Sequence, residues 1–585
     1  MQQSNLHRFH IPVMGLAFTI DSPLKVARFG ISSVVSIVED KLVEMMRKHY
    51  YTLHNLNYTP ITAQEPDARS RRITDYLNLL NELVKKQMDQ LKQSAFETGS
   101  EIVKYFEMLP DSNPLKQAYQ NFQKASSPAE KTALEKHLRS SIIAGSIDVN
   151  IMTKVDRDSD AVTALKGYAE SDLRNSSIVF SAGLNPRLFN FIGTSKAFDL
   201  NEQGSFDKKI VIKVSDYRSA LIQGKYLAKK GRWVSEFRIE SGLNCGGHAF
   251  ATDGILLGPI LDEFKAKRKE LTDTLFEMFN QSLVLQKKQP LSVPPPIQFS
   301  VQGGIGTAAE DELLHSYYEM DSTGWGTPFL LVPEATTVDK ETLELLCKAR
   351  ESDLSLSNSS PLGVRFHYLR GTSAEKERKS RIERNNPGSP CTEKHLAFNT
   401  EFTEEPICTA SKKYQRLKLE QLKTLGLPEA EYKRQTTEVL DKECLCVGLS
   451  NSAAINYEQT FVKKLDAVTI CPGPNIVNFS KLVSLQTMTD HIYGRTDIVT
   501  NPVRPHMFIA ELHLYIDFLK EKIGEDKTSG LFERNQSYYR TFLKNLYLGI
   551  RYYLNLPPGS IQYPEQFQKD LQLAELELDC INFQL

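Results

Sequence analysis

Three glycine-rich segments of the chain carry residue types that suit the binding of an anion. Glycine lets backbone N–H groups approach an anion without obstruction by a Cβ atom, and a following helix start adds partial positive charge. Gly303, Gly304, Gly326 and Thr327 therefore suit a phosphate group, although turn glycines that bind no ligand have the same appearance. The segments read GLNCGGH at 242–248, VQGGI at 301–305 and GWGT at 324–327.

The first of these segments ends in His248. An imidazole needs only a small pKa shift to donate or accept a proton near neutral pH, so His248 is the candidate catalytic residue. The alternative is a histidine at a helix start that makes a structural hydrogen bond. Cys245 lies in the same segment, where a buried thiol is more often a small apolar side chain than a nucleophile.

The elements that must position these segments form an α/β pattern. Short β-rich runs alternate with helix-like stretches through roughly the first 330 residues, which is typical of a parallel sheet. Eight such strands are the number that closes a barrel, and chemistry is then expected where the strands end. The three glycine segments lie at the ends of the last three runs. The runs span 10–18, 31–37, 147–152, 177–183, 210–215, 233–240, 297–304 and 321–327.

A chain of 585 residues exceeds the size at which one core normally stops growing. We expect a (β/α)8 TIM barrel over residues 1–345, in the α/β class. Apolar residues at helical spacing predict a helical insertion at about 60–145, over one barrel mouth. After about residue 345 the alternation ends, and 346–585 is expected to be a mainly helical C-terminal extension of unknown role.

The ordered set of motifs resembles nitronate monooxygenases and related flavin-dependent enoyl reductases. That family carries G-x-E-x-G-G-H, A-G-G-I and G-T at the ends of its sixth, seventh and eighth strands. The turn Pro12-Val13-Met14-Gly15 and the pair Val149-Asn150 resemble its first and third strands. This chain has Asn244 where the family has an acidic residue, so the resemblance supports the reaction class better than the substrate.

The resemblance implies an FMN-dependent oxidoreductase, similar to a nitronate monooxygenase, whose substrate it does not identify. His248 would face the flavin. Lys213 would stabilise negative charge on the reduced flavin, unless it is only a solvated lysine at a strand end. The implied cofactor-binding residues are Met14, Gly15, Asn150, Lys213, Gly246, Gly247, Gly303, Gly304, Gly326 and Thr327.

Four cysteines of the extension, Cys391, Cys408, Cys444 and Cys446, form a candidate site for an iron–sulfur cluster or zinc. Their spacing matches no strong CxxC pattern, and scattered buried thiols are the alternative. With a cluster, the chain would pass electrons between the cluster and FMN, which resembles the FMN-barrel domain of glutamate synthase. A third interpretation is a barrel without redox activity that serves as a binding or assembly subunit.

The amino-acid composition limits which classes of partner are expected. The chain has 71 Lys and Arg against 72 Asp and Glu, so its net charge gives no electrostatic attraction to nucleic acid as a partner. A small organic substrate is expected, with NAD(P)H or a redox protein as electron donor. No apolar stretch is long enough to span a bilayer, and eight cysteines in so long a chain do not indicate a disulfide framework. The expected location is the cytoplasm.

Overall fold

The protein is built on a closed barrel of eight parallel strands, which confirms the predicted (β/α)8 fold. The computed structural model describes the chain except residues 1–5, 153–159, 182, 391–392, 460–461, 463–464 and 584. Neighbouring strands pair in chain order, and β1 closes the barrel against β8. The strands are β1 (Phe9–Ile11), β2 (Ser32–Ser36), β3 (Ile147–Ile151), β4 (Ser176–Phe180), β5 (Lys208–Val214), β6 (Val234–Glu240), β7 (Gln298–Gln302) and β8 (Ser322–Gly324).

Strand β6 illustrates why the sequence folds this way. Phe237 and Ile239 are fully buried, and Phe237 stacks on Phe299 of β7. Glu236 and Arg238 alternate with these two residues and point to the opposite face of the strand, where their side chains form an ion pair at 2.9 Å. Because successive side chains of a strand point to opposite faces, this alternation sends apolar groups outward to the helices and charged groups inward.

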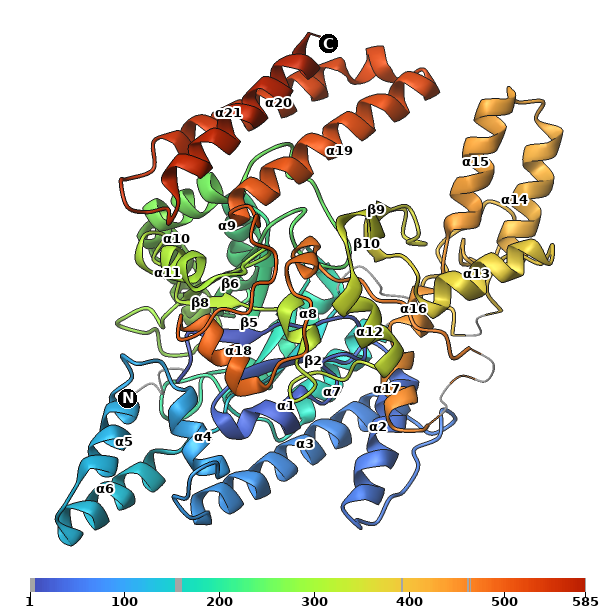
Figure 1. The fold of residues 1–585 in the computed structure, drawn as a ribbon. Coiled ribbons are helices and arrows are strands. Elements are labelled where there is room, and N and C mark those ends of the chain that lie inside the picture. The colour runs from blue at the N-terminus through green and yellow to red at the C-terminus, as the bar shows by residue number, and fades with distance from the viewer. Residues whose placement is uncertain are drawn as a thin grey trace.

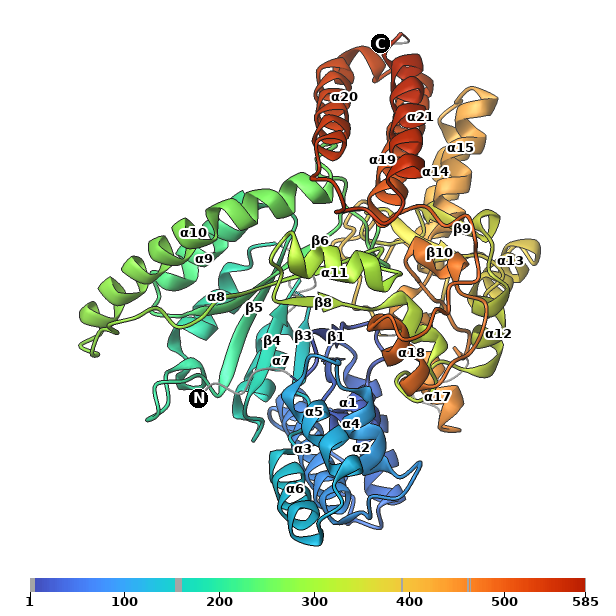
Figure 2. The ribbon, with the colours of Figure 1, turned by 60° about the vertical axis from the view of Figure 1, so that its left-hand side comes forward.

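The helices around the barrel and in the insertion have the predicted amphipathic pattern, and α10 is the long green helix at the upper left of Figure 2. The α-helices up to β8 are α1 (Ser22–Val26), α2 (Asp40–Leu53), α3 (Ala68–Gln93), α4 (Glu101–Met108), α5 (Pro114–Lys124), α6 (Pro128–Ser141), α7 (Asp160–Glu170), α8 (Pro186–Thr194), α9 (Tyr217–Ala228), α10 (Leu257–Leu285) and α11 (Ala308–Ser316). Short 3-10 helices are η1 (Ala27–Phe29), η2 (Lys196–Phe198) and η3 (Thr327–Leu331).

The predicted insertion is confirmed as helical and lies at the side where the first strands begin. Its Asn113 side chain donates to the carbonyl of Leu6, which precedes β1, and Tyr105 donates to Ile143, which precedes β3. In Figure 2 helices α3 to α6 lie at the end of the molecule opposite α20 and α21. The insertion therefore contacts the segments before β1 and β3, while its helix α3 packs along α7, where Thr74 donates to Gly167 O.

The C-terminal extension is mainly helical, as predicted, with a short antiparallel hairpin of β9 and β10. Helices α19, α20 and α21 form a bundle, and α14 and α15 project as a separate hairpin (Figure 1). The elements are α12 (Lys340–Lys348), η4 (Glu351–Asp353), β9 (Leu354–Ser357), β10 (Phe366–Leu369), α13 (Ser373–Glu383), α14 (Lys412–Thr424), α15 (Glu429–Asp441), α16 (Leu445–Gly448), α17 (Asn451–Asn456), η5 (Pro474–Asn478), α18 (Leu485–Ile492), α19 (Met507–Ser529), α20 (Phe532–Leu554) and α21 (Pro564–Asn582).

The extension shares a hydrophobic core with the barrel. One continuous cluster of buried side chains includes Phe9 and Phe299 of the barrel together with Leu512 and Tyr553 of the extension. Tyr553 of α20 also accepts a hydrogen bond from Gly258 N at the start of α10. Among the described residues, every helix is too short or too polar to cross a lipid bilayer.

Candidate functional site

A cavity of about 750 Å³ opens where the eight strands end. Residues that follow each of the eight strands contribute to its wall, which is the position expected for chemistry in a TIM barrel. None of residues 60–145, all of which the structure describes, lines it. The wall includes His248 and every residue expected to bind the cofactor: Met14, Gly15, Asn150, Lys213, Gly246, Gly247, Gly303, Gly304, Gly326 and Thr327.

One end of the cavity is formed by the glycine segments together with residues 470–475 of the extension. Gly247 N donates to Cys471 O at 3.2 Å, and Gly473 N donates to Thr327 Oγ1 at 3.0 Å. A Cβ atom on Gly246 would lie 2.5 Å from Cys471 O, so this approach requires glycine. The Thr327 hydroxyl accepts from Gly473 and keeps its own proton for a ligand. The extension thus closes the cavity above the glycine loops.

Arg504 of the extension fixes the loop after β7. Its guanidinium pairs with both carboxylate oxygens of Glu310, at 2.7 and 2.9 Å, and donates to Gly304 O at 2.8 Å. Both side chains are buried, 6% and 2% exposed. Burial alone would raise the pKa of Glu310, but Arg504 and hydrogen bonds such as that from Gly306 N hold the pKa below its ordinary value. The ion pair therefore anchors the predicted phosphate loop to the extension.

Asn244, the departure from the family motif, is a structural residue here. Its side-chain amide donates to Met507 O at the start of α19, at 3.2 Å, and its backbone N donates to Ser241 Oγ. Gly304 has a φ of +79°, and a Cβ atom there would lie 2.0 Å from Asn244 Nδ2. The loops after β6 and β7 are therefore packed against each other, and any side chain at position 304 would disturb both.

The floor of the cavity is polar. Lys213 Nζ lies 3.0 Å from Glu240 Oε1, and Gln302 Nε2 donates to the same oxygen at 2.5 Å. Lys213 is therefore paired with a carboxylate inside the cavity and is not a solvated strand-end lysine. Nearby, Ser36 Oγ, Asn150 Oδ1 and Gln302 Oε1 are buried without a hydrogen-bond partner. Such atoms are costly unless something bonds to them, so they indicate a polar ligand.

His248 lies where the barrel meets the β9–β10 hairpin. Its Nε2 is 2.7 Å from Ser360 Oγ, its ring packs edge-on against Phe366, and its backbone forms a bridge with Phe366. The side chain lines the cavity, so it is placed to meet a ligand while its orientation is set by the extension. His248 thus makes the hydrogen bond of the structural interpretation and also lines the cavity.

Glu511 of α19 contacts the start of the loop after β6. It is buried, accepts from Ser241 Oγ at 2.5 Å and accepts from Leu257 N at 2.8 Å. Burial raises the pKa of Glu511 to about 7, and these two hydrogen bonds limit the rise. A carboxyl group of the extension, in contact with the residue before the GLNCGGH loop, therefore has a pKa near neutral pH.

This raised pKa predicts a pH-dependent stability. A carboxyl group with a folded-state pKa above its unfolded value stabilises the fold below the unfolded pKa, and this contribution is lost as pH rises through about 7. We expect Glu511 to lower the free energy of unfolding by roughly 2 to 3 kcal/mol between pH 5 and pH 8. Urea titrations of the wild type and Glu511→Gln check this, and equal pH profiles would contradict it.

Three of the four cysteines predicted to bind a metal lie among the described residues. Cys408, Cys444 and Cys446 do not converge in any metal-binding group within the described part of the chain, and Cys391 lies outside it. Cys444 lies at the start of α16 and lines a small surface cavity beside α13. The four-cysteine site therefore stays a prediction, because Cys391 lies outside the described residues. The group that does form combines Glu39, Glu393 and His395.

Several site residues were missed by sequence reasoning. Glu240 was detectable, because it lies two residues before the GLNCGGH segment and shares the inward face of Glu236 and Arg238. Gln302 follows the same logic on β7. Glu511 and Arg504 had no signal, since they lie more than 190 residues from their partners in the chain.

Comparison with known proteins gives little further guidance. No protein family and no curated protein matches the sequence. Among solved structures, the chain is similar to a FabK mutant from Thermotoga maritima, with 12% identity and a TM-score of 0.29. The match covers 63% of this chain and 80% of that chain. A likeness at this level carries no argument on function, so the fold assignment rests on the closed eight-stranded barrel.

Proposed function

We propose that the chain is an FMN-dependent oxidoreductase that resembles nitronate monooxygenases and acts on a small organic substrate. The observation that carries the proposal is the meeting of two features in one cavity. Glycine loops suited to a phosphate form one end, and buried polar atoms without partners form the floor. Its volume of about 750 Å³ lies within the range of cofactor and ligand sites.

The residues present fit the group. The phosphate would bind at Gly303, Gly304, Gly326 and Thr327, where backbone N–H groups and a hydroxyl proton are available. The ring system has polar edges that both donate and accept hydrogen bonds. Asn150 and Gln302 on the floor have side-chain amides that match such edges, and each has an oxygen without a partner.

FMN, when bound, supplies the transfer of an electron pair between a donor and an acceptor. The chain supplies the surroundings. Lys213 offers positive charge next to Glu240, and this pairing keeps the floor close to neutral before reaction. His248 holds or moves a proton at its imidazole, and residues 470–475 limit the access of water. The electron donor would be NAD(P)H or a redox protein, and the acceptor an organic molecule or oxygen.

A charge placed at Gly326 tests the phosphate end. A Cβ atom there would lie 3.3 Å from Pro12 and 3.7 Å from the Met14 sulfur, and the backbone has no positive φ, so a side chain is tolerated with small shifts. A carboxylate about 5 Å from a phosphate costs about 3 kcal/mol per unit charge at an effective dielectric of about 20. We therefore expect Gly326→Asp to weaken FMN binding about 100-fold relative to Gly326→Asn, measured by fluorescence titration.

Gly326→Asn is the matched control, because it has the same shape without the charge. Equal affinities in the two variants would contradict a phosphate at this loop. Purified wild-type protein should be yellow, and heating should release FMN that mass spectrometry identifies. A colourless protein that takes up no added FMN would instead favour a barrel that serves as a binding or assembly subunit.

A further inference from the structure

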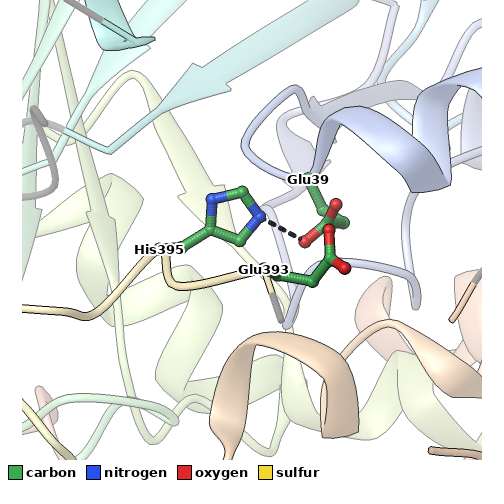
Figure 3. A group of neighbouring side chains, drawn as sticks. All are labelled: Glu39, Glu393 and His395. Atoms are coloured by element: carbon green, nitrogen blue, oxygen red, sulfur yellow. Dashed lines mark ion pairs between the residues drawn. The ribbon is translucent and has the colours of Figure 1, made fainter. Parts of the chain in front are cut away.

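Two carboxylates and an imidazole meet where the extension contacts the barrel, outside the cavity. Glu39 directly precedes α2 and follows the end of β2, while Glu393 and His395 belong to the loop between α13 and α14. Figure 3 shows the three side chains pointing toward one another from these two segments. One ligand-type atom from each residue lies within 4.8 Å of the others.

The group is withdrawn from solvent. The side chains of Glu39, Glu393 and His395 are 1%, 6% and 16% exposed. The two carboxylate oxygens of Glu39 have different neighbours. Oε1 accepts a hydrogen bond from Lys41 N at the start of α2, and Oε2 faces the ring of His395. A carboxylate buried to this degree needs a cation or several hydrogen-bond donors to offset the loss of water.

The contact between Glu39 and His395 has an unusual geometry for an ion pair. Glu39 Oε2 and His395 Nε2 are 2.7 Å apart, yet the contact is not oriented as a hydrogen bond, and neither buried atom has a hydrogen-bond partner. Each of these two atoms can instead donate an electron pair to a cation, and a carboxylate oxygen of Glu393 lies within 4.8 Å of both. Imidazole nitrogen and carboxylate oxygen are both ligands that a metal ion such as Zn²⁺ accepts in proteins.

The local charge is also compatible with a cation. Lys41 Nζ lies 2.6 Å from Glu393 Oε1, and Arg69 donates to Val38 O nearby, while Asp40 adds a further carboxylate paired with Arg72. With a neutral imidazole, the two carboxylates and Lys41 leave one net negative charge at the group. A divalent ion would therefore be attracted, and less strongly than at a site without the lysine.

We infer that Glu39, Glu393 and His395 form a divalent transition-metal site, of the Zn²⁺ type, which ties the loop after α13 to the barrel. Imidazole with carboxylate oxygens suits Zn²⁺ better than the all-oxygen ions Mg²⁺ and Ca²⁺. Three protein ligands leave one position of a tetrahedral ion for water or another ligand. The site is independent of the proposed flavin site and of the predicted cysteine site.

The test is Zn²⁺ binding to the full-length chain, measured by calorimetry at pH 7.5 and by metal analysis after dialysis. We expect the wild type to bind about one Zn²⁺ per chain and His395→Gln to lose it, with affinity reduced by more than about 100-fold. Loss of even an outer-shell partner typically costs about 10- to 100-fold in metal affinity, and His395 is a direct ligand in this inference. Glu393→Gln should weaken binding similarly. His137→Gln, which changes an exposed histidine of α6, is the matched control and should bind like the wild type.

A second comparison separates this site from thiol binding. The double variant Cys444→Ser/Cys446→Ser should retain the Zn²⁺, and saturating Zn²⁺ should raise the melting temperature of the wild type but not of His395→Gln. Zn²⁺ that is lost with the cysteines and kept by His395→Gln would overturn the inference. So would a wild-type chain that binds no Zn²⁺, in which case the group is an ion pair between protonated His395 and Glu39.

Discussion

His248→Asn is expected to lower turnover by roughly two to four orders of magnitude while FMN stays bound. This is the usual contribution of a general acid or base, and the cavity residues assigned to the flavin come mainly from other strands. Turnover per bound flavin is the measurement, with an acceptor found by screening nitronates and activated alkenes. Because asparagine is polar and its amide replaces the near half of the imidazole ring, it preserves part of the packing against Phe366.

The hydrogen bond between His248 Nε2 and Ser360 Oγ supplies the control. Ser360→Ala removes that partner without removing the imidazole, so it should change the pH dependence of turnover more than its maximum. If His248 only holds its loop, His248→Asn should instead weaken FMN binding and thermal stability together. Normal turnover in a flavin-saturated His248→Asn protein would refute the catalytic role.

Arg504→Ala is expected to lower the free energy of unfolding by about 3 to 5 kcal/mol, because it leaves Glu310 buried without its counter-charge. The loss should grow as the pH rises from 4 to 7. In the wild type the lowered pKa of Glu310 gives stability that is present above its unfolded value and lost in acid. Without Arg504, ionisation of Glu310 becomes unfavourable, so the two proteins should be most alike at low pH.

Chemical denaturation of the apo protein at several pH values measures this effect. Arg504→Ala combined with Glu310→Gln should recover much of the loss, since the amide carries no charge to compensate. FMN affinity should also fall in Arg504→Ala, because Arg504 Nη2 holds Gly304 O in the predicted phosphate loop. A loss below about 1 kcal/mol that is independent of pH would contradict the role assigned to the ion pair.

Local patterns in the sequence determined the barrel. All eight predicted runs overlap the observed strands, and five of the runs contain their strand whole, because period-two alternation and turn residues are properties of short segments. The same patterns placed the glycine segments at strand ends. In a parallel barrel these ends must meet at one face, and the eleven residues predicted for catalysis and cofactor binding, Lys213 and His248 among them, do line one cavity.

Only the tertiary structure decided how the extension completes that cavity. Segment 470–475 closes over the glycine loops, Arg504 neutralises Glu310, and Glu511 supports Ser241. These contacts join residues far apart in the chain, and their formation depends on how two groups of helices pack, which no local pattern specifies. For the same reason no local pattern indicated that Glu39 and His395 meet across 356 positions.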